Sequence, residues 1–282
     1  MPVHDDLGKR MKEFYEQVPK TRLVRRMPVA IRIDGKSFHS FTKNFERPFD
    51  DILIKSMQET TKYLCENIQG CVLGYTQSDE ITLILVDYNT LESSAWFDAE
   101  VQKMCSVSAS MATMAFNKFF VQNCHEWSNM LEDQTVTFDP DNKYAKLFSA
   151  YSKAIEKGAM FDSRVFNIPK EETCNLIYWR QLDCTRNSIQ MVGQANFSHK
   201  ELHGKSCNMI QDMLHEQKGI NWNDFPAHKK RGTCVVRKGQ ADGRMHWTID
   251  TEIPIFKGEG REYIDKLIFV GNGSCKGELY AN

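Results

Sequence analysis

Acidic residues at two places in the amino-terminal third of the chain could bind metal ions together. Asp34 ends a strand-like run, and Asp79 and Glu80 lie in the turn of a predicted hairpin over 71–87. Neighbouring strands lie about 5 Å apart, so pairing of these strands would bring the carboxylates together. Mg²⁺ prefers such oxygen ligands, and two such ions stabilise the attacking and leaving oxygens of a phosphoryl displacement. The pattern predicts nucleotidyl transfer, and the same geometry also fits nucleotide cyclases and polymerase palms.

Each of these signals also has a plainer interpretation. An Asp-Gly pair such as Asp34-Gly35 commonly forms an ordinary turn after a strand, and the polar residues from Ser78 to Glu80 commonly form a solvated turn. Gly35 would let the backbone come close to a metal or a phosphate, because it has no side chain. The metal site is favoured by the combination of the two acidic positions, one strand-helix-strand unit apart.

The elements that must position these residues follow from periodicity and from capping residues. Alternating runs predict strands, and Asp50 is placed to cap a helix after Pro48. Residues 125–158 give no clear pattern. Strands are expected at 28–34, 71–77, 80–87, 161–168, 233–237 and 245–251, and helices at 4–17, 50–68, 95–120, 171–196 and 198–217. The chain is therefore predicted to be an α+β protein.

The composition is that of a folded protein with only local sites for nucleic acid. Hydrophobic residues make up 41% of the 282 residues, and the formal net charge is −1. Affinity for a polyphosphate backbone grows with the phosphates that Lys and Arg neutralise, so indiscriminate coating of RNA is excluded. The local candidates are two basic clusters, for which solvated surface is the alternative: Lys20, Arg22, Arg25 and Arg26, and Lys229, Lys230 and Arg231.

Apolar runs and cysteines indicate the compartment. No apolar run approaches the roughly 20 residues of a membrane span, and the first residues lack the apolar segment of a secretory signal. We therefore expect a cytoplasmic protein that contacts no membrane. The nine cysteines are scattered without a CxxC pair, which favours reduced, mostly buried thiols. A structural zinc site built from distant Cys and His residues is the alternative.

Four segments resemble motifs of the tRNA-histidine guanylyltransferase family. IRIDGKSFHSFTK at 31–43 is similar to the first motif of the family, and GYTQSDEITLIL at 74–85 is similar to the second. FDSRVFNIP at 161–169 and IYWRQLDC at 177–184 match further segments in order. The resemblance covers roughly residues 28–190.

The resemblance implies a palm-like catalytic core with the ferredoxin-like order βαββαβ, related to polymerases and cyclases. It places this core in residues 1–190 and leaves 191–282 as a mixed α/β appendage that binds tRNA or builds the oligomer. Members of the family commonly function as tetramers, so a homotetramer is expected.

The resemblance also assigns site residues. Asp34 and Asp79 would be catalytic and would hold two Mg²⁺ ions, with the Gly35 carbonyl as a further metal ligand and Glu80 as a supporting catalytic carboxylate. His39 could alternatively be a packed structural residue. The residues expected to bind the nucleotide and its phosphates are Lys36, Ser37, Phe38, His39, Arg47, Ser78 and Lys103.

Two further polar groups have two interpretations each. On the predicted helix 171–196, Arg180, Asp183 and Asn187 lie at i, i+3 and i+7, and therefore on one face that could contact RNA. The alternative is a solvated or internally bonded face. Asp162 and Arg164, on a predicted strand, form either a structural ion pair or a substrate contact.

One departure from the family separates two activities. Guanylyltransferases have His-Ile-Asn-Asn where this chain has Thr-Arg-Asn-Ser at 185–188. The departure favours the guanylyltransferase-like branch, whose members repair 5′-truncated tRNA by templated 3′-to-5′ addition after ATP or GTP activates the 5′ phosphate. The alternatives are non-templated addition of G to histidine tRNA, a palm-type cyclase acting on free nucleotides, and a non-catalytic RNA-binding module.

Overall fold

A single antiparallel sheet organises the molecule. The computed structural model describes residues 6–132, 142–239 and 243–270. Within them, six strands pair in the order β4-β1-β3-β2-β5-β6, and every neighbouring pair is antiparallel. The strands are β1 (Val29–Gly35), β2 (Cys71–Gln77), β3 (Glu80–Leu85), β4 (Phe161–Asn167), β5 (Thr233–Gly239) and β6 (Met245–Asp250).

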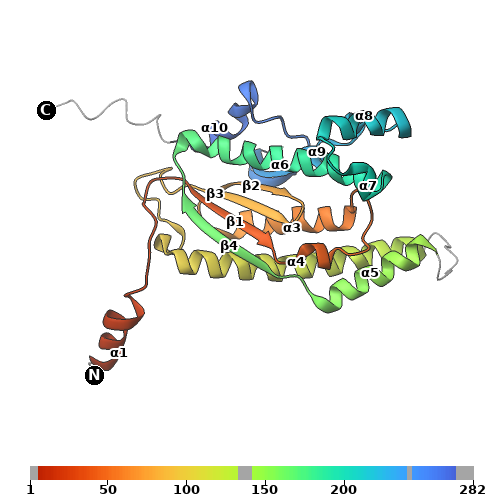
Figure 1. Cartoon of the computed structure of the whole chain (residues 1–282). Helices are drawn as coiled ribbons and strands as arrows, with labels where there is room; N and C mark the ends of the chain where they lie inside the picture. The colour runs from red at the N-terminus through yellow and green to blue at the C-terminus, as the bar shows by residue number, and fades with distance from the viewer. Residues whose placement is uncertain (1–5, 133–141, 240–242, 271–282) are drawn as a thin grey trace.

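Helices cover both faces of this sheet (Figure 1). α3 and α4 pack on one face, and α6 and α10 pack on the other. The α-helices of the described residues are α1 (Asp6–Met11), α2 (Phe38–Phe41), α3 (Asp51–Asn67), α4 (Val101–Glu132), α5 (Lys143–Lys157), α6 (Lys170–Asn196), α7 (His199–Leu202), α8 (Cys207–Lys218), α9 (Ala227–Arg231) and α10 (Glu262–Ile268).

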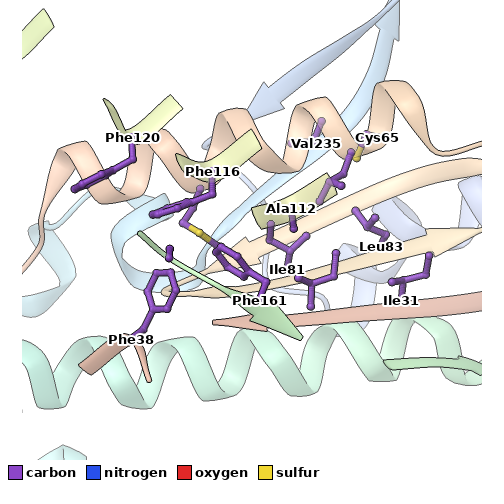
Figure 2. Packing of buried hydrophobic residues seen from close by; sticks show 14 of the residues in the cluster. Ile31, Phe38, Cys65, Ile81, Leu83, Ala112, Phe116, Phe120, Phe161 and Val235 are labelled. Atoms are coloured by element: carbon purple, nitrogen blue, oxygen red, sulfur yellow. The ribbon is translucent and has the colours of Figure 1, made fainter. Parts of the chain in front are cut away.

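The alternation of side chains along β1 explains the two layers. Ile31 and Ile33 are fully buried against the α3 and α4 side, whereas Ala30 is buried against the α6 and α10 side. Figure 2 shows Ile31 in the first of these clusters, together with Ile81 and Phe116. Successive residues of a strand point to opposite faces, so the face of β1 toward α3 and α4 stays apolar, whereas the other face changes from Ala30 to Arg32 and Asp34.

The α+β prediction is confirmed, with corrections to the helix bounds. The helix expected at 95–120 begins only at Val101, after a 3₁₀ turn over Trp96–Ala99, and continues to Glu132. The helix expected at 198–217 is divided into α7 and α8. The second half of the unclear stretch 125–158 forms α5.

The carboxy-terminal third shares the sheet of the amino-terminal part. β5 pairs with β2, and β6 pairs with β5. The expected boundary at residue 190 falls inside α6, which spans 170–196. A long-range pairing of this kind leaves no local pattern in the sequence. The sequence therefore predicted a separate appendage, whereas β5 and β6 extend the sheet of the amino-terminal part.

The structure describes two features that the sequence analysis used, the apolar segments and the cysteines. Within the described residues, none of the helices combines the length and apolar character that crossing a membrane requires. The eight cysteines in this part of the chain are free thiols, and six of them are buried. The ninth, Cys275, lies outside the described residues.

Candidate active site

The hairpin of β2 and β3 brings the two acidic positions together, as the sequence predicts. Asp34 at the end of β1 is the cross-strand partner of Glu80, the first residue of β3. The Gly35 amide donates a hydrogen bond of 3.1 Å to the Asp79 carbonyl oxygen. Asp34, Gly35 and Asp79 therefore form one corner at the end of the sheet.

Gly35 is needed at this corner for a packing reason. A Cβ atom at position 35 would lie 2.2 Å from the ring of Phe38, which is only 5% exposed. Phe38 packs with Phe41, Phe116 and Phe161, and Figure 2 shows Phe38 near the last two. This aromatic cluster holds the loop after β1 in place, so any larger residue at 35 would displace it.

Neighbouring carboxylates concentrate negative charge at the corner. Burial raises the pKa of the Asp79 carboxyl above its ordinary value, and the nearby Asp34 and Glu80 carboxylates raise this pKa further. A hydrogen bond from the Ser78 hydroxyl lowers it, with an oxygen to oxygen distance of 2.9 Å. Carboxylates placed so close together repel one another until a cation or a proton neutralises them.

Two arginines neutralise the negative charge of the Glu80 carboxylate. The Glu80 side chain is 8% exposed and contacts Arg180 of α6 at 2.7 Å and Arg32 of β1 at 3.2 Å. Arg180 is equally buried and also bonds Asp183 at 2.9 Å. The RNA contact expected at Arg180 is therefore wrong, because the guanidinium is enclosed between the sheet and α6. Glu80 supports the turn that carries Asp79.

A pocket of about 520 Å³ opens beside the corner. One wall is the loop after β1, another is the β2-β3 turn, and a third is the end of α6. The predicted residues that line it are Gly35, Ser37, Phe38, His39, Arg47, Ser78 and Asp79. We call it the nucleotide pocket, because it gathers most of the residues that the sequence predicts to bind a nucleotide. Lys36 is exposed next to Gly35 and does not line the pocket.

Lys103 lies elsewhere, which corrects the prediction for it. Thr113 of α4 accepts a hydrogen bond from the Phe161 amide, and Phe161 is the strand partner of Gly35. Lys103 precedes Thr113 on the same helix by about 15 Å at 1.5 Å per residue. It is exposed near Glu100 at the start of α4, and it does not line this pocket.

The predicted basic cluster on α9 is not an open RNA surface. Lys229 pairs with Asp51 at 2.6 Å, and Lys230 is buried with its ammonium bonded to the Asn223 carbonyl oxygen. Arg231 is partly exposed. The expectation of an RNA patch is therefore wrong for Lys230 at least, because the short helix α9 packs this lysine under Trp222.

The polar face on α6 is internally bonded, which was the plainer of its two interpretations. Asp183 pairs with Arg180 and Arg186, and the Asn187 amide lies 3.4 Å from an Asp183 carboxylate oxygen. Asn187 remains partly exposed. Asp162 and Arg164 form an ion pair of 3.6 Å.

Sequence reasoning missed the residues that complete the pocket from distant elements. Met191 and Gln194 reach it from the end of α6, and Glu46 and Asp50 reach it from the loop before α3. Asp50 was predicted as a helix cap and does accept a hydrogen bond from the Leu53 amide. Its further bond from the Tyr151 hydroxyl, at 2.8 Å, comes from α5 and could not be read from local sequence.

Asp50 carries a pH-dependent part of the stability. Burial raises the pKa of its carboxyl above the ordinary value, so the folded chain holds this proton more tightly than the unfolded chain. The contribution of Asp50 to the unfolding free energy is complete below the unfolded pKa and is lost as pH rises through the folded pKa. Asp50→Asn removes this titration. In urea unfolding, the stability of the wild type relative to the variant should fall as pH rises above the ordinary carboxyl pKa of about 4. A difference that does not change with pH would contradict this.

The donor set at the corner fits a hard cation that takes its remaining ligands from water or a substrate. In the described part of the chain, no group of three or more His, Cys, Asp or Glu side chains is arranged to hold a metal ion. The corner offers two carboxylates, Asp34 and Asp79, and the backbone of Gly35. Mg²⁺ is usually held by one or two carboxylates, with waters and substrate phosphates as its other ligands, so these residues suit it.

Comparison with known proteins identifies the family. A family model described as tRNAHis guanylyltransferase matches residues 8–169, which include the whole acidic corner. The chain belongs to the tRNAHis guanylyltransferase family. Its named members are nucleotidyltransferases, so the expectation of such an enzyme is confirmed at the level of the family.

Individual members of the guanylyltransferase family are similar to this chain over most of its length. A bacterial tRNA(His) guanylyltransferase-like protein, solved in complex with ATP, is 38% identical, with a TM-score of 0.76 over 94% of this chain and 100% of that one. A structure of a bacterial protein of the same description in complex with GTP is 35% identical, with a TM-score of 0.71 and the same coverage. The tRNA(His) guanylyltransferase of Saccharomyces cerevisiae is 28% identical over 226 residues, which cover 75% of this chain and 83% of the yeast protein.

Proposed function

We propose that this guanylyltransferase-family enzyme adds nucleotides in the 3′-to-5′ direction to the 5′ end of tRNA, with Mg²⁺ and with the opposite strand as template. The observation that carries the proposal is the acidic corner of Asp34, Gly35 and Asp79, because Gly35 and Asp79 line the nucleotide pocket and Asp34 precedes Gly35 on β1. Related bacterial proteins have been solved with ATP and with GTP, which supports nucleoside triphosphates as the ligands.

The residues of the corner have separate roles in this proposal. Asp34, Asp79 and the Gly35 carbonyl would hold Mg²⁺, which supplies charge stabilisation for the attacking and leaving oxygens. Arg47, exposed at the pocket edge, and the exposed Lys36 neutralise phosphate charge. Ser37, His39 and Ser78 line the pocket and orient the nucleotide. Phe38 acts through packing, because it is buried.

The reaction proposed here has two steps. ATP or GTP first transfers a nucleotidyl group to the 5′-monophosphate of the RNA, and pyrophosphate leaves. The 3′-hydroxyl of the incoming nucleotide then attacks the activated 5′ phosphate, forming a new P–O bond and releasing the activating nucleotide monophosphate. An RNA that already carries a 5′-triphosphate needs only the second step and releases pyrophosphate.

The sheet topology supports a palm-like core. β1, α3, β2, β3, α4 and β4 follow one another along the chain, and their strands pair in the order β4-β1-β3-β2. This is the antiparallel βαββαβ arrangement that we expect for a polymerase palm. It places the end of β1 beside the β2-β3 turn, where the two metal-binding aspartates must meet.

The segment at 185–188 supports templated addition over dedicated addition of G. The Thr185 hydroxyl donates to the Lys230 carbonyl oxygen at 3.2 Å, and the Ser188 hydroxyl accepts from the Trp222 indole at 3.1 Å. Both side chains are thus used to attach α6 to its neighbours. They leave few groups to read a base directly, which suits an enzyme whose product is specified by base pairing.

Pyrophosphate release tests the reaction class. Wild-type protein with Mg²⁺, a labelled nucleoside triphosphate and a 5′-triphosphorylated, 5′-truncated tRNA should release pyrophosphate and label the RNA, and chelation by EDTA should stop both. Release without RNA, with a cyclic nucleotide as product, would establish the cyclase alternative. Binding of RNA without any release would favour a non-catalytic binding module. The tetramer and the cytoplasmic location remain predictions.

A further inference from the structure

A second cavity adjoins the nucleotide pocket on the side of α7. It has a volume of about 430 Å³ and shares Arg47 and Gln194 with the nucleotide pocket. Its other polar lining side chains are Gln190, His199, His203 and Lys205. We call this cavity the side groove. Because the two cavities share walls, a ligand that leaves the nucleotide pocket past Arg47 enters the side groove.

The lining of the side groove has the chemistry of an anion site. It contains Arg47 and Lys205 as cations and His199 and His203 as further donors, and no Asp or Glu among the described residues lines it. His199, His203 and Lys205 are exposed. The predicted basic cluster of α9 differs, since Lys229 there is paired with a carboxylate and Lys230 is buried.

The wall behind these side chains is rigid. Val192 of α6 packs with Ile210 and Leu214 of α8, and all three are buried. A Cβ atom at Gly193 would lie 2.8 Å from the Ile210 side chain, so the absence of one lets α6 and α8 approach closely. A packed wall fixes the backbone positions from which the cationic side chains extend, so only the side chains of the protein have to become ordered on binding.

We propose that the side groove binds the phosphate backbone of the RNA strand whose 5′ end lies in the nucleotide pocket. This inference rests on the proposed function and adds the path of the RNA. The continuity of the two cavities favours an RNA strand over a separate small ligand, because a strand must run from the reacting 5′ end to the rest of the molecule. A chain with a net charge of −1 also needs such a local cationic track to hold RNA.

Two lysines of the same segment provide a matched test. Lys205 lines the side groove, whereas Lys200 is exposed on α7 and does not line it. The experiment compares Lys205→Gln with Lys200→Gln in equilibrium binding to a 5′-monophosphorylated tRNA that lacks its first nucleotide, without any catalysis. ATP binding is measured in parallel at increasing salt.

The expected result is a loss of RNA affinity in Lys205→Gln of about five-fold at about 0.1 M salt. The slope of log affinity against log salt should fall by about 0.7 to 0.9, as for one lost phosphate contact. ATP binding should stay unchanged in both variants, and Lys200→Gln should bind RNA like the wild type.

Two results would overturn the inference. Equal RNA affinity in the two variants would show that the side groove does not bind the strand. Loss of a second bound equivalent of ATP in Lys205→Gln, with RNA affinity intact, would assign the groove to a nucleoside triphosphate. Because binding is measured without turnover, wild-type protein that binds RNA but never extends it would defeat the proposed function and leave this inference standing.

Discussion

Asp79→Asn is expected to lower nucleotidyl transfer by at least about 10³-fold, or roughly 4 kcal/mol of transition-state stabilisation at 1.36 kcal/mol per tenfold. Asp79 and Asp34 are the two carboxylates of the corner, so the substitution removes half of the side-chain charge that can hold Mg²⁺. The same effect is expected for Asp34→Asn. Steady-state extension of a 5′-triphosphorylated RNA, with circular dichroism as a check on folding, measures it.

Asp162 is the matched control for this prediction. It is the cross-strand partner of Asp34 on the other side of β1, and it forms its own exposed ion pair with Arg164. Asp162→Asn removes the same charge from the same row of the sheet, outside the corner. We expect the activity of this variant to stay within about three-fold of wild type, since exposed ion pairs contribute little. A folded Asp79→Asn variant with activity close to that of Asp162→Asn would contradict the assignment of the metal-binding carboxylates.

Arg180→Met is expected to cost about 3–5 kcal/mol of unfolding free energy. The guanidinium is buried, and it bonds the equally buried Glu80 at 2.7 Å and Asp183 at 2.9 Å. Without it, Glu80 keeps only Arg32 as a cationic partner while remaining inaccessible to water. Urea unfolding monitored by tryptophan fluorescence measures the loss, and Glu80→Gln combined with Arg180→Met should recover part of it.

Arg186 offers the comparison for Arg180. It pairs with the same Asp183 from the exposed face of α6, with its side chain 64% exposed. Arg186→Met should cost no more than about 1 kcal/mol, because solvent already screens this ion pair. If Arg180→Met were as mild as Arg186→Met, the buried contact of Arg180 with Glu80 would not support the turn that carries Asp79.

The parts of the site built by local patterns could be predicted from the sequence. Alternation marks β1, the polar turn marks the β2-β3 hairpin, and Asp50 marks the start of α3, so the corner of Asp34 and Asp79 follows from neighbouring segments. The family match over 8–169 agrees with this resemblance. The residue roles within the corner remain predictions.

The remaining features depend on contacts that local patterns do not contain. The spacing of Arg180, Asp183 and Asn187 correctly places them on one face of α6, but spacing does not say whether that face points to solvent or to the sheet. The position of Lys103 depends on where α4 begins and which way it crosses the sheet. The far wall of the nucleotide pocket at Gln194 comes from a helix end about 150 residues along the chain from the loop it faces.

The most direct test of the account is a change of template. Two 5′-truncated tRNA substrates, identical except for the base opposite the missing nucleotide, are incubated with the protein, Mg²⁺, ATP and all four nucleoside triphosphates, and the new 5′ ends are sequenced. The account predicts that each product carries the complement of its own template base. Addition of G to both substrates, or extension of neither, would contradict templated 3′-to-5′ addition by this site.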